Sequence, residues 1–455
     1  MLVGLLAGLD PRFALVAAFG TAFVLIVLAN LAAGLAVFTM VSFLDLLPVS
    51  GTAVTIPKAA GLLLVLAWVA DLTAQRASTN NFLSEHPYLS YVLLLFLGWA
   101  AASLLWAESP ADGLDNLYRY VLNILLFLVA YTAIRRRQEA IWVVAAFLAG
   151  AMVSACVGIA FPTAPESPDD IARLSGAGVE ANELAAVLVA TLSLALAFVL
   201  AWRNAPVVRL MAFGVMVVCV LGVILSFSRG GLVALAVALL AGVVLGGRWR
   251  PFAIVCLVLV SLGVVGYLTL VATPQESERV TALEGGTGRE DIWAVGWRMV
   301  ESSPTNGIGV GNFPVSSVHF LLAPGALQRD EFIVDEPKVA HNIYLEVLAE
   351  LGVIGLALFV SILVFSLVSA IRAARVFGRA DDRQMELLSR CVAIALIALL
   401  AADFFVSEQF SKQLWLLLAL GPALLRIARR EEEDEDTYRE AEPRETPPRP
   451  VPAYG

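Results

Sequence analysis

Charge is scarce in this sequence. Charged residues make up 15% of its 455 positions, against about 25% in an ordinary globular domain. Apolar residues make up 59%, against roughly 45–50% in such a domain. The alternation of apolar and polar residues that is typical of a spanning β-barrel is also missing, because the apolar runs are apolar on all faces. These features exclude a soluble enzyme and predict an all-α, polytopic helical membrane protein.

Cysteine and histidine are rare as well. The chain has four cysteines and three histidines, and no two cysteines stand at a spacing that is typical of a metal or redox site. The histidines form no HxxxH or HExxH pattern. We therefore expect no disulfide, no metal site and no cofactor. The cysteines are Cys156, Cys219, Cys256 and Cys391.

The sequence lacks a basic stretch of the kind that binds nucleic acid. Its net charge is −9, and a large part of that charge comes from one acidic run at 431–436. The N-terminus lacks the basic region and the small-residue cleavage site of a secretory signal peptide. We therefore expect no nucleic-acid partner, and we expect the first apolar run to remain as an anchor among membrane lipids.

Long apolar runs are what the sequence has in abundance. They predict about twelve transmembrane helices. The count depends on the first two runs, which are separated by Asn30 and Gly34 and are each short for a full crossing. The runs lie at about 13–29, 31–47, 58–74, 88–106, 116–134, 139–161, 182–202, 207–227, 231–247, 251–271, 341–371, 389–405 and 413–427.

The arginines in short loops predict the orientation of these helices, because loops rich in Lys and Arg stay in the cytoplasm. Their phase is consistent over nine successive spans and places the C-terminus in the cytoplasm. It places four segments outside, at 107–115, 162–181, 227–231 and 272–340. The arginines used are Arg135 to Arg137, Arg203, Arg209, Arg248, Arg250, Arg372, Arg375, Arg379, Arg383, Arg426, Arg429 and Arg430.

The chain divides into four parts on this basis. They are N-terminal transmembrane helices at 1–271, a large external loop at 272–340, C-terminal transmembrane helices at 341–427 and a cytoplasmic tail at 428–455. The tail is acidic and then rich in proline, so we expect it to be disordered.

The external loop contains one amphipathic stretch at 289–300, with apolar residues at helical spacing. Pro304 should end this helix, and Gly307, Gly309 and Gly311 predict a flexible turn after it. A helix at the membrane surface is the simplest interpretation of the spacing alone.

Three arginines are placed at the outer edge of the membrane, against the charge bias, and so call for an anionic partner. Arg229 lies in a short turn between two spans, and Arg289 follows the glycine-rich stretch 285–288 at a helix start. Backbone N–H groups and the helix dipole favour an anion there. Arg119 lies just inside a span. For each of them alone, a snorkelling side chain or a salt bridge to a neighbouring acid is the simpler interpretation. Two arginines beside glycine-rich turns on one face favour a phosphate or diphosphate clamp.

Among the histidines, His341 stands where the external loop re-enters the membrane. An imidazole there titrates near neutral pH and can take a proton from a hydroxyl. A helix-capping or core histidine is the simpler interpretation of that position. His86 and His319 are expected to be surface residues.

The residues from His341 to Leu356, HNIYLEVLAELGVIGL, resemble the signature of the O-antigen ligase and O-antigen polymerase superfamily. Further pieces match, and the resemblance covers roughly residues 170–370. Ser228-Arg229-Gly230 resembles the family's short arginine turn, and Asn182 resembles a polar position at the start of the seventh run. The start of the external loop matches at Gly288, Arg289, Ile292, Trp293, Pro304, Gly307, Gly309, Gly311 and Phe313.

The resemblance implies a lipid-linked-glycan glycosyltransferase of the inner (cytoplasmic) membrane. Such an enzyme transfers a glycan from undecaprenyl diphosphate, on the outer face of that membrane, to an acceptor hydroxyl on a glycan, lipid or protein. Arg229 and Arg289 would hold the diphosphate, and His341 would deprotonate the acceptor. A single displacement would invert the anomeric carbon, and the arginines would replace a metal ion.

Four further residues are candidates for substrate contacts: Arg119, Asn182, Asn342 and Tyr344. Glu346 and Glu350 lie further along the re-entering helix and are expected to be structural partners.

Two rivals remain open at this point. A polymerase that extends the glycan on the same carrier would share these motifs. A transporter or flippase for an anionic lipid-linked substrate belongs to a different class, and the one-sided external loop argues against it, because transporters are built around broken helices at the membrane midplane.

Overall fold

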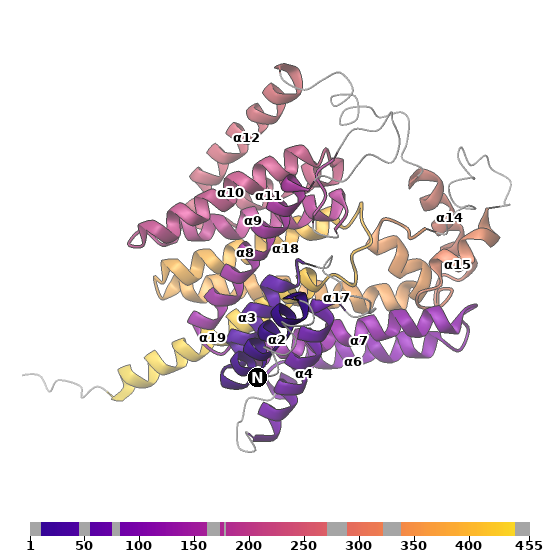
Figure 1. Cartoon of the computed structure of the whole chain (residues 1–455), viewed down its shortest axis with the longest axis horizontal. Coiled ribbons are helices and arrows are strands. Elements are labelled where there is room, and N and C mark those ends of the chain that lie inside the picture. The colour runs from indigo at the N-terminus through magenta and orange to yellow at the C-terminus, as the bar shows by residue number, and fades with distance from the viewer. Residues whose placement is uncertain are drawn as a thin grey trace, which may run out of the picture.

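The computed structural model describes residues 11–44, 55–74, 82–161, 173–176, 179–270, 289–321 and 338–441. The described residues form an all-helical structure. In Figure 1 most of the long helices run across the view, with α14 (Arg289–Ser302) and α15 (Phe313–Ser317) at one end. The last part of α19 (Lys412–Ala441) projects at the other end.

Each predicted apolar run coincides, over all or part of its length, with a helix. Among the described residues, eight helices are long and apolar enough to cross a membrane, and four apolar helices are shorter. The membrane character is therefore confirmed, whereas the count of about twelve spans stays a prediction. Besides α19, the helices are α2 (Pro11–Ala29), α3 (Leu31–Val41), α4 (Ile56–Ala74), α6 (Pro87–Ser103), α7 (Pro110–Ala133), α8 (Arg137–Ala160), α9 (Ala181–Ala201), α10 (Pro206–Leu225), α11 (Arg229–Leu245), α12 (Arg250–Leu270), α17 (Ile343–Arg379) and α18 (Arg383–Ala402).

Polar residues and prolines set where these helices begin. Proline occupies the first position of α6, α7 and α10, where its missing N–H leaves no helical bond unmade. Asn342 caps α17, since its Oδ1 accepts hydrogen bonds from the N–H groups of Tyr344 at 3.0 Å and Leu345 at 3.1 Å. Ser228 caps α11 in the same way through the N–H of Gly231. Such caps satisfy N–H groups that have no partner within the helix.

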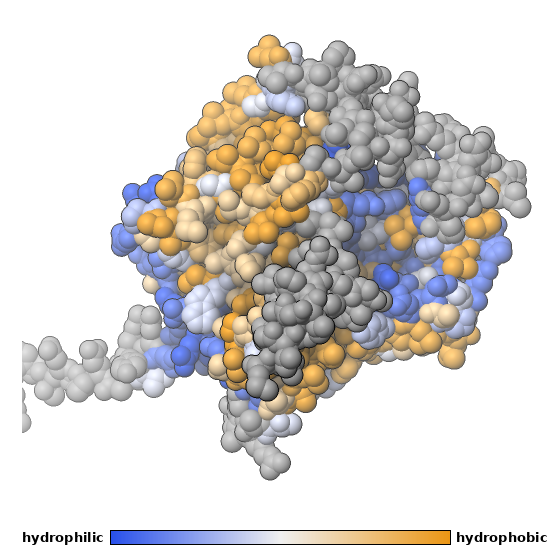
Figure 2. Space-filling view, in the orientation of Figure 1, coloured by the Kyte–Doolittle hydropathy of each residue, from blue (hydrophilic) through white to orange (hydrophobic). Residues whose placement is uncertain are grey.

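The centre of the bundle is formed by α9 and α18, which pack against each other and are the most buried of the spans. By contrast, the apolar part of α12 has no buried residue. In Figure 2 apolar side chains cover much of the flank near α10 and α11, and hydrophilic side chains gather at the two ends of the bundle. An apolar flank between polar ends is the pattern that a bilayer requires.

Helix α17 breaks at Gly352, which has φ 66° and ψ −172°. The sequence predicted one uninterrupted span here, so this is a correction. The freed backbone groups have partners: Ile308 N–H donates to Ala349 at 2.9 Å, and Gly309 N–H to Glu350 at 2.9 Å. Trp99 Nε1 donates to Leu351 at 2.8 Å. The break is stable because these polar groups are paired away from water.

The described part of residues 272–340, which we predicted to be external, packs as a cap on the first turns of α17. Helix α14 ends at Ser302, just before Pro304, as predicted. Its apolar face packs with α15 and α17 in a small separate core, which does not fit a helix that lies alone on the membrane surface. That core consists of Ile292, Val295, Met299, Val300, Phe313, Ala340 and Ala349.

The glycine turn after α14 is held firmly, contrary to the expectation of flexibility. Gly307, Gly309 and Gly311 all have positive φ, which only glycine adopts without strain. A Cβ built on Gly307 would lie 2.3 Å from Glu350, and one on Gly309 would lie 2.6 Å from Ala107. The glycines therefore permit close contact between the cap and the membrane helices.

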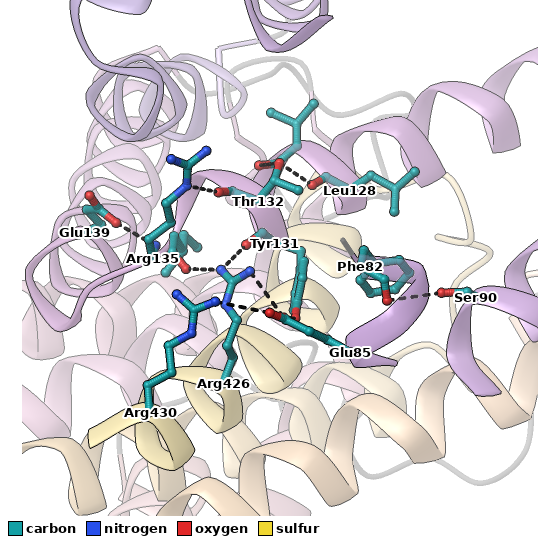
Figure 3. A network of polar contacts seen from close by, with 12 residues as sticks. Phe82, Glu85, Ser90, Leu128, Tyr131, Thr132, Arg135, Glu139, Arg426 and Arg430 are labelled. Atoms are coloured by element: carbon teal, nitrogen blue, oxygen red, sulfur yellow. Dashed lines mark hydrogen bonds and ion pairs between the residues drawn. The ribbon is translucent and has the colours of Figure 1, made fainter. Parts of the chain in front are cut away.

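The opposite end of the bundle carries an arginine network (Figure 3). Arg426, which is 5% exposed, donates hydrogen bonds of 2.6 Å to the carbonyls of Tyr131 and Ile134. Its guanidinium lies 4.1 Å from the Tyr131 ring centroid. Glu85 pairs with Arg430 at 3.1 Å. Three of the arginines predicted to be cytoplasmic, Arg135, Arg426 and Arg430, thus lie together at one end of the bundle.

Two expectations for this end are corrected. Helix α19 continues to Ala441, so residues 428–441 are helical rather than disordered, and the Arg137–Glu431 pair at 2.6 Å helps to hold them. Residues 442–455 lie outside the described residues. His86 is buried among the rings of Phe82, Tyr131 and Phe365 rather than exposed, and burial lowers its pKa to about 4.

Candidate functional site

Arg229 begins α11, directly after a tight turn that follows α10. Phe227 in that turn has φ 46°, a conformation that costs a non-glycine residue energy. Neighbouring groups hold the turn, since Ser226 Oγ donates to Val223 at 2.7 Å and accepts from the N–H of Ser228 at 3.3 Å. The position of Arg229 is thereby fixed by short contacts on its N-terminal side.

The two glycines after Arg229 let other segments approach closely. A Cβ on Gly230 would lie 3.1 Å from Phe405, and one on Gly231 would lie 2.7 Å from Ala185. Gly231 therefore packs against α9, and Gly230 packs against the segment between α18 and α19. The glycine pair after Arg229 is therefore required for close packing of these segments.

Arg289 is the first residue of α14, so its backbone lies at the positive end of a helix dipole. Trp293, one turn further on, donates from Nε1 to the carbonyl of Ala340 at 3.0 Å. This bond attaches the arginine helix to the residue that precedes His341. The stretch 285–288, in which we expected backbone N–H groups to contact an anion, lies outside the described residues.

His341 stands at the entry to α17 with φ 48°. The residues on either side are held by hydrogen bonds: Ala340 N–H donates to Glu346 at 3.0 Å, and Asn342 N–H donates to Ser407 at 3.2 Å. Ile343 N–H donates to the carbonyl of Asp403 at 3.0 Å. The backbone that carries the imidazole is therefore fixed on both sides.

The three predicted residues Arg229, Arg289 and His341 come together in one electrostatic cluster. Burial lowers the pKa of Arg289, and the nearby Arg229 lowers it further, while Glu180 acts in the opposite direction. Burial also lowers the pKa of His341, with a further contribution from Arg289, again opposed by Glu180. An imidazole beside guanidinium groups stays neutral to a lower pH and keeps the capacity to accept a proton.

The four other candidates have structural partners. Asn342 caps α17, and Tyr344 donates from its hydroxyl to Leu400 at 2.8 Å. Asn182 accepts a hydrogen bond from Arg173 at 2.7 Å. Arg119 pairs with Asp115 at 3.0 Å while about half exposed, and it lies 5.7 Å from the Phe410 ring centroid.

Glu346 and Glu350 are buried and hold loops, in agreement with the structural role expected for them. The Glu346 carboxylate accepts hydrogen bonds from Ala340 N–H, Ser407 and Gln409. Glu350 accepts from the N–H groups of Gly311 at 2.8 Å and Phe313 at 3.1 Å. The two carboxylates thus join α17 to the cap and to the 403–411 segment.

Sequence reasoning missed the acidic side of the site. Glu180 acts on both Arg289 and His341. Burial raises the pKa of Glu408, and a hydrogen bond with Glu183 and the charges of Asp403 and Glu180 add to this effect. Single carboxylates at helix ends have no spacing pattern, so only the fold brings them together. Arg173 was also missed, because it belongs to no sequence motif.

The fold and these residues define a class: a helical membrane protein with two arginines and a histidine gathered beside the cap on α17. Residues 214–360 match the family model described as O-Antigen ligase, a range that includes Arg229, Arg289 and His341. This match confirms the resemblance to the O-antigen ligase superfamily. Members of this family are glycosyltransferase-like membrane enzymes. No curated protein matches the chain.

Proposed function

We propose that this protein is an O-antigen ligase-like glycosyltransferase that moves a glycan from undecaprenyl diphosphate to an acceptor hydroxyl. The reaction takes place on the outer face of the cytoplasmic (inner) membrane. The observation that carries the proposal is that Arg229, Arg289 and His341 come together from three separate segments, with Arg229 acting electrostatically on Arg289 and Arg289 acting on His341.

The arginines hold the diphosphate of the donor. Guanidinium groups bind phosphate oxygens through two parallel hydrogen bonds, and the start of α14 adds the positive end of a helix dipole. Negative charge grows on the diphosphate as the bond to the sugar breaks. Fixed positive groups stabilise that charge without reorganisation and without a metal ion.

His341 is the catalytic base of this proposal. Its neutral imidazole takes the proton of the acceptor hydroxyl while the oxygen attacks the anomeric carbon from the side opposite the diphosphate. One displacement of this kind inverts the configuration at that carbon. The lowered pKa of His341 keeps the imidazole in the proton-accepting form.

Transfer and donor binding should separate when His341 is replaced. We expect His341→Ala to abolish glycan transfer and to leave binding of the lipid-linked donor intact, because the arginines hold the diphosphate. His319→Ala is the matched control, since His319 is exposed and pairs with Glu108 on the outside of the cap. His86→Ala should also retain transfer per folded molecule. Full transfer by His341→Ala would exclude the base.

The acceptor separates a ligase from a polymerase. The purified protein is incubated with undecaprenyl-diphosphate-linked glycan and candidate lipid, protein and glycan acceptors, and the product that carries the sugar is identified by mass. Glycan on a foreign acceptor supports a ligase. Glycan that is lengthened on the same lipid carrier supports the polymerase. Movement of the intact donor from one leaflet of a vesicle to the other, with no new glycosidic bond, supports a flippase.

A further inference from the structure

The segment 173–176 lies across the ends of three helices on the side of the bundle where Arg229 lies. Leu174 N–H donates to the carbonyl of Leu225, the last residue of α10, at 3.0 Å. The carbonyl oxygen of Ser175 lies so close to α8 that a Cβ on Gly158 would come within 1.9 Å of it. The segment is therefore fitted to its neighbours.

Arg173 makes two hydrogen bonds from this segment. Its Nε donates to the carbonyl of Ser226 at 2.9 Å, and one of its terminal nitrogens donates to Oδ1 of Asn182 at 2.7 Å. Ser226 belongs to the turn that precedes Arg229, and Asn182 belongs to the first turn of α9. One planar guanidinium thus joins two elements that border the site.

The turn that Arg173 holds is one that needs support. Phe227 adopts φ 46°, and such a conformation persists only where the surroundings impose it. The hydrogen bond from Arg173 reaches this turn from a separate segment, at the Ser226 carbonyl, one residue before Phe227. The rigid fork of arginine directs two donors at fixed angles, which lysine cannot reproduce.

We propose that Arg173 is a positioning residue that fixes the location of Arg229 by holding the Ser226 carbonyl against Asn182. The inference rests on the proposed function, in which Arg229 holds the donor diphosphate. Asn182 then acts through Arg173 rather than through the sugar, which differs from the role expected from the sequence.

A double-mutant cycle tests this coupling. Transfer rates at saturating donor are measured for Arg173→Ala, Arg229→Ala and the double variant, each normalised to folded protein by size-exclusion chromatography. Loss of hydrogen bonds from a charged group should lower the rate of Arg173→Ala about 10-fold. If Arg173 acts through Arg229, the double variant should be no slower than Arg229→Ala alone. Arg209→Ala, exposed near the start of α10, is the control and should keep the full rate.

The outcomes separate the two proposals. Normal transfer by Arg229→Ala would overturn the proposed function together with this inference. A slow Arg229→Ala beside an unaffected Arg173→Ala would overturn the inference alone. If the fold loss in transfer rate of the double variant equals the product of the two single losses, the inference is also overturned, because Arg173 then acts independently of Arg229.

Arg173→Lys keeps the test decisive if the alanine variant does not fold. It retains the charge and can reach one acceptor, so we expect a folded protein with a lowered kcat and a nearly unchanged KM for the acceptor. A wild-type kcat in this variant would overturn the inference. Asn182→Leu removes the second acceptor and should lower kcat to a similar extent.

Discussion

Trp293 donates a hydrogen bond from Nε1 to the carbonyl of Ala340 at 3.0 Å. Trp293 lies one turn after Arg289, and Ala340 immediately precedes His341, so one bond joins the segments that carry the proposed anion ligand and the proposed base. The Trp293 ring also meets Phe404 edge-on, with centroids 5.6 Å apart. The arginine and the histidine therefore share one packed unit.

We expect Trp293→Phe to lower the transfer rate by about 3- to 10-fold, because it keeps most of the ring packing but removes a hydrogen bond with a net contribution of about 1 kcal/mol. Trp297→Phe on the same helix is the control, since the Trp297 side chain is 54% exposed. Steady-state rates of both variants are compared. Equal rates for the two would show that the bond does not position the site.

The anion clamp predicts large losses of turnover. Arg229→Ala and Arg289→Ala should each remove about 2–4 kcal/mol of transition-state stabilisation, or roughly 30- to 1000-fold in rate. Lysine at either position should restore little, because an ammonium group lacks the planar fork. Rates are measured on protein that elutes as a folded peak. Near-normal rates in both alanine variants would contradict the clamp and would favour the interpretation of these arginines as snorkelling side chains.

The two arginines could be singled out from the sequence because each stands beside a glycine pattern on the side that the charge bias leaves poor in arginine. Their placement on one face also follows from the sequence, whereas the position of Glu180 beside Arg289 and His341 does not. Likewise, the helical character of each apolar run follows from composition. The break at Gly352 depends on Ile308, Gly309 and Trp99, which supply partners from distant segments.

Capping residues show a different limit of sequence reasoning. Asn342 follows His341 in the family-like string and was expected to contact substrate, yet its Oδ1 is occupied by two N–H groups of α17. Tyr344 was placed in the same group, and its hydroxyl is bonded to Leu400. A motif records both chemistry and the local structure that supports it, and only the contacts separate the two.

The pH dependence of transfer should report the environment of His341. Burial and Arg289 hold its pKa below the ordinary value of about 6.5. Transfer should therefore stay at its plateau as the pH falls through 6.5 and decline only below the lowered pKa, where the imidazole takes up a proton. In Arg289→Gln the loss of one positive charge raises this pKa, so the decline of the residual activity should move to higher pH. Profiles of kcat/KM for both proteins decide the matter; a shift to lower pH in the variant would contradict the assignment.

The arginine network at the far end predicts the orientation of the chain. Thr437 lies in the last part of α19 and should face the cytoplasm, whereas Gln328 should face the outside. Single cysteines at these positions, in a variant without native cysteines, are treated with an impermeant thiol reagent in intact spheroplasts. We expect labelling at 328 and none at 437 until the membrane is permeabilised. The reverse pattern would place the candidate site on the wrong side for a lipid-linked donor.

The break in α17 predicts a strong dependence on glycine at position 352. A Cβ there would lie 2.1 Å from the Thr305 carbonyl oxygen, and the φ of 66° is unfavourable for any L side chain. We expect Gly352→Ala to destabilise the protein by at least about 1–2 kcal/mol. Gly98→Ala is the control, because Gly98 lies on α6 with open space around it; there alanine should be neutral or stabilising by up to about 1 kcal/mol. Thermal unfolding of both variants in the same detergent gives the comparison, and equal midpoints would mean that α17 runs unbroken through this position.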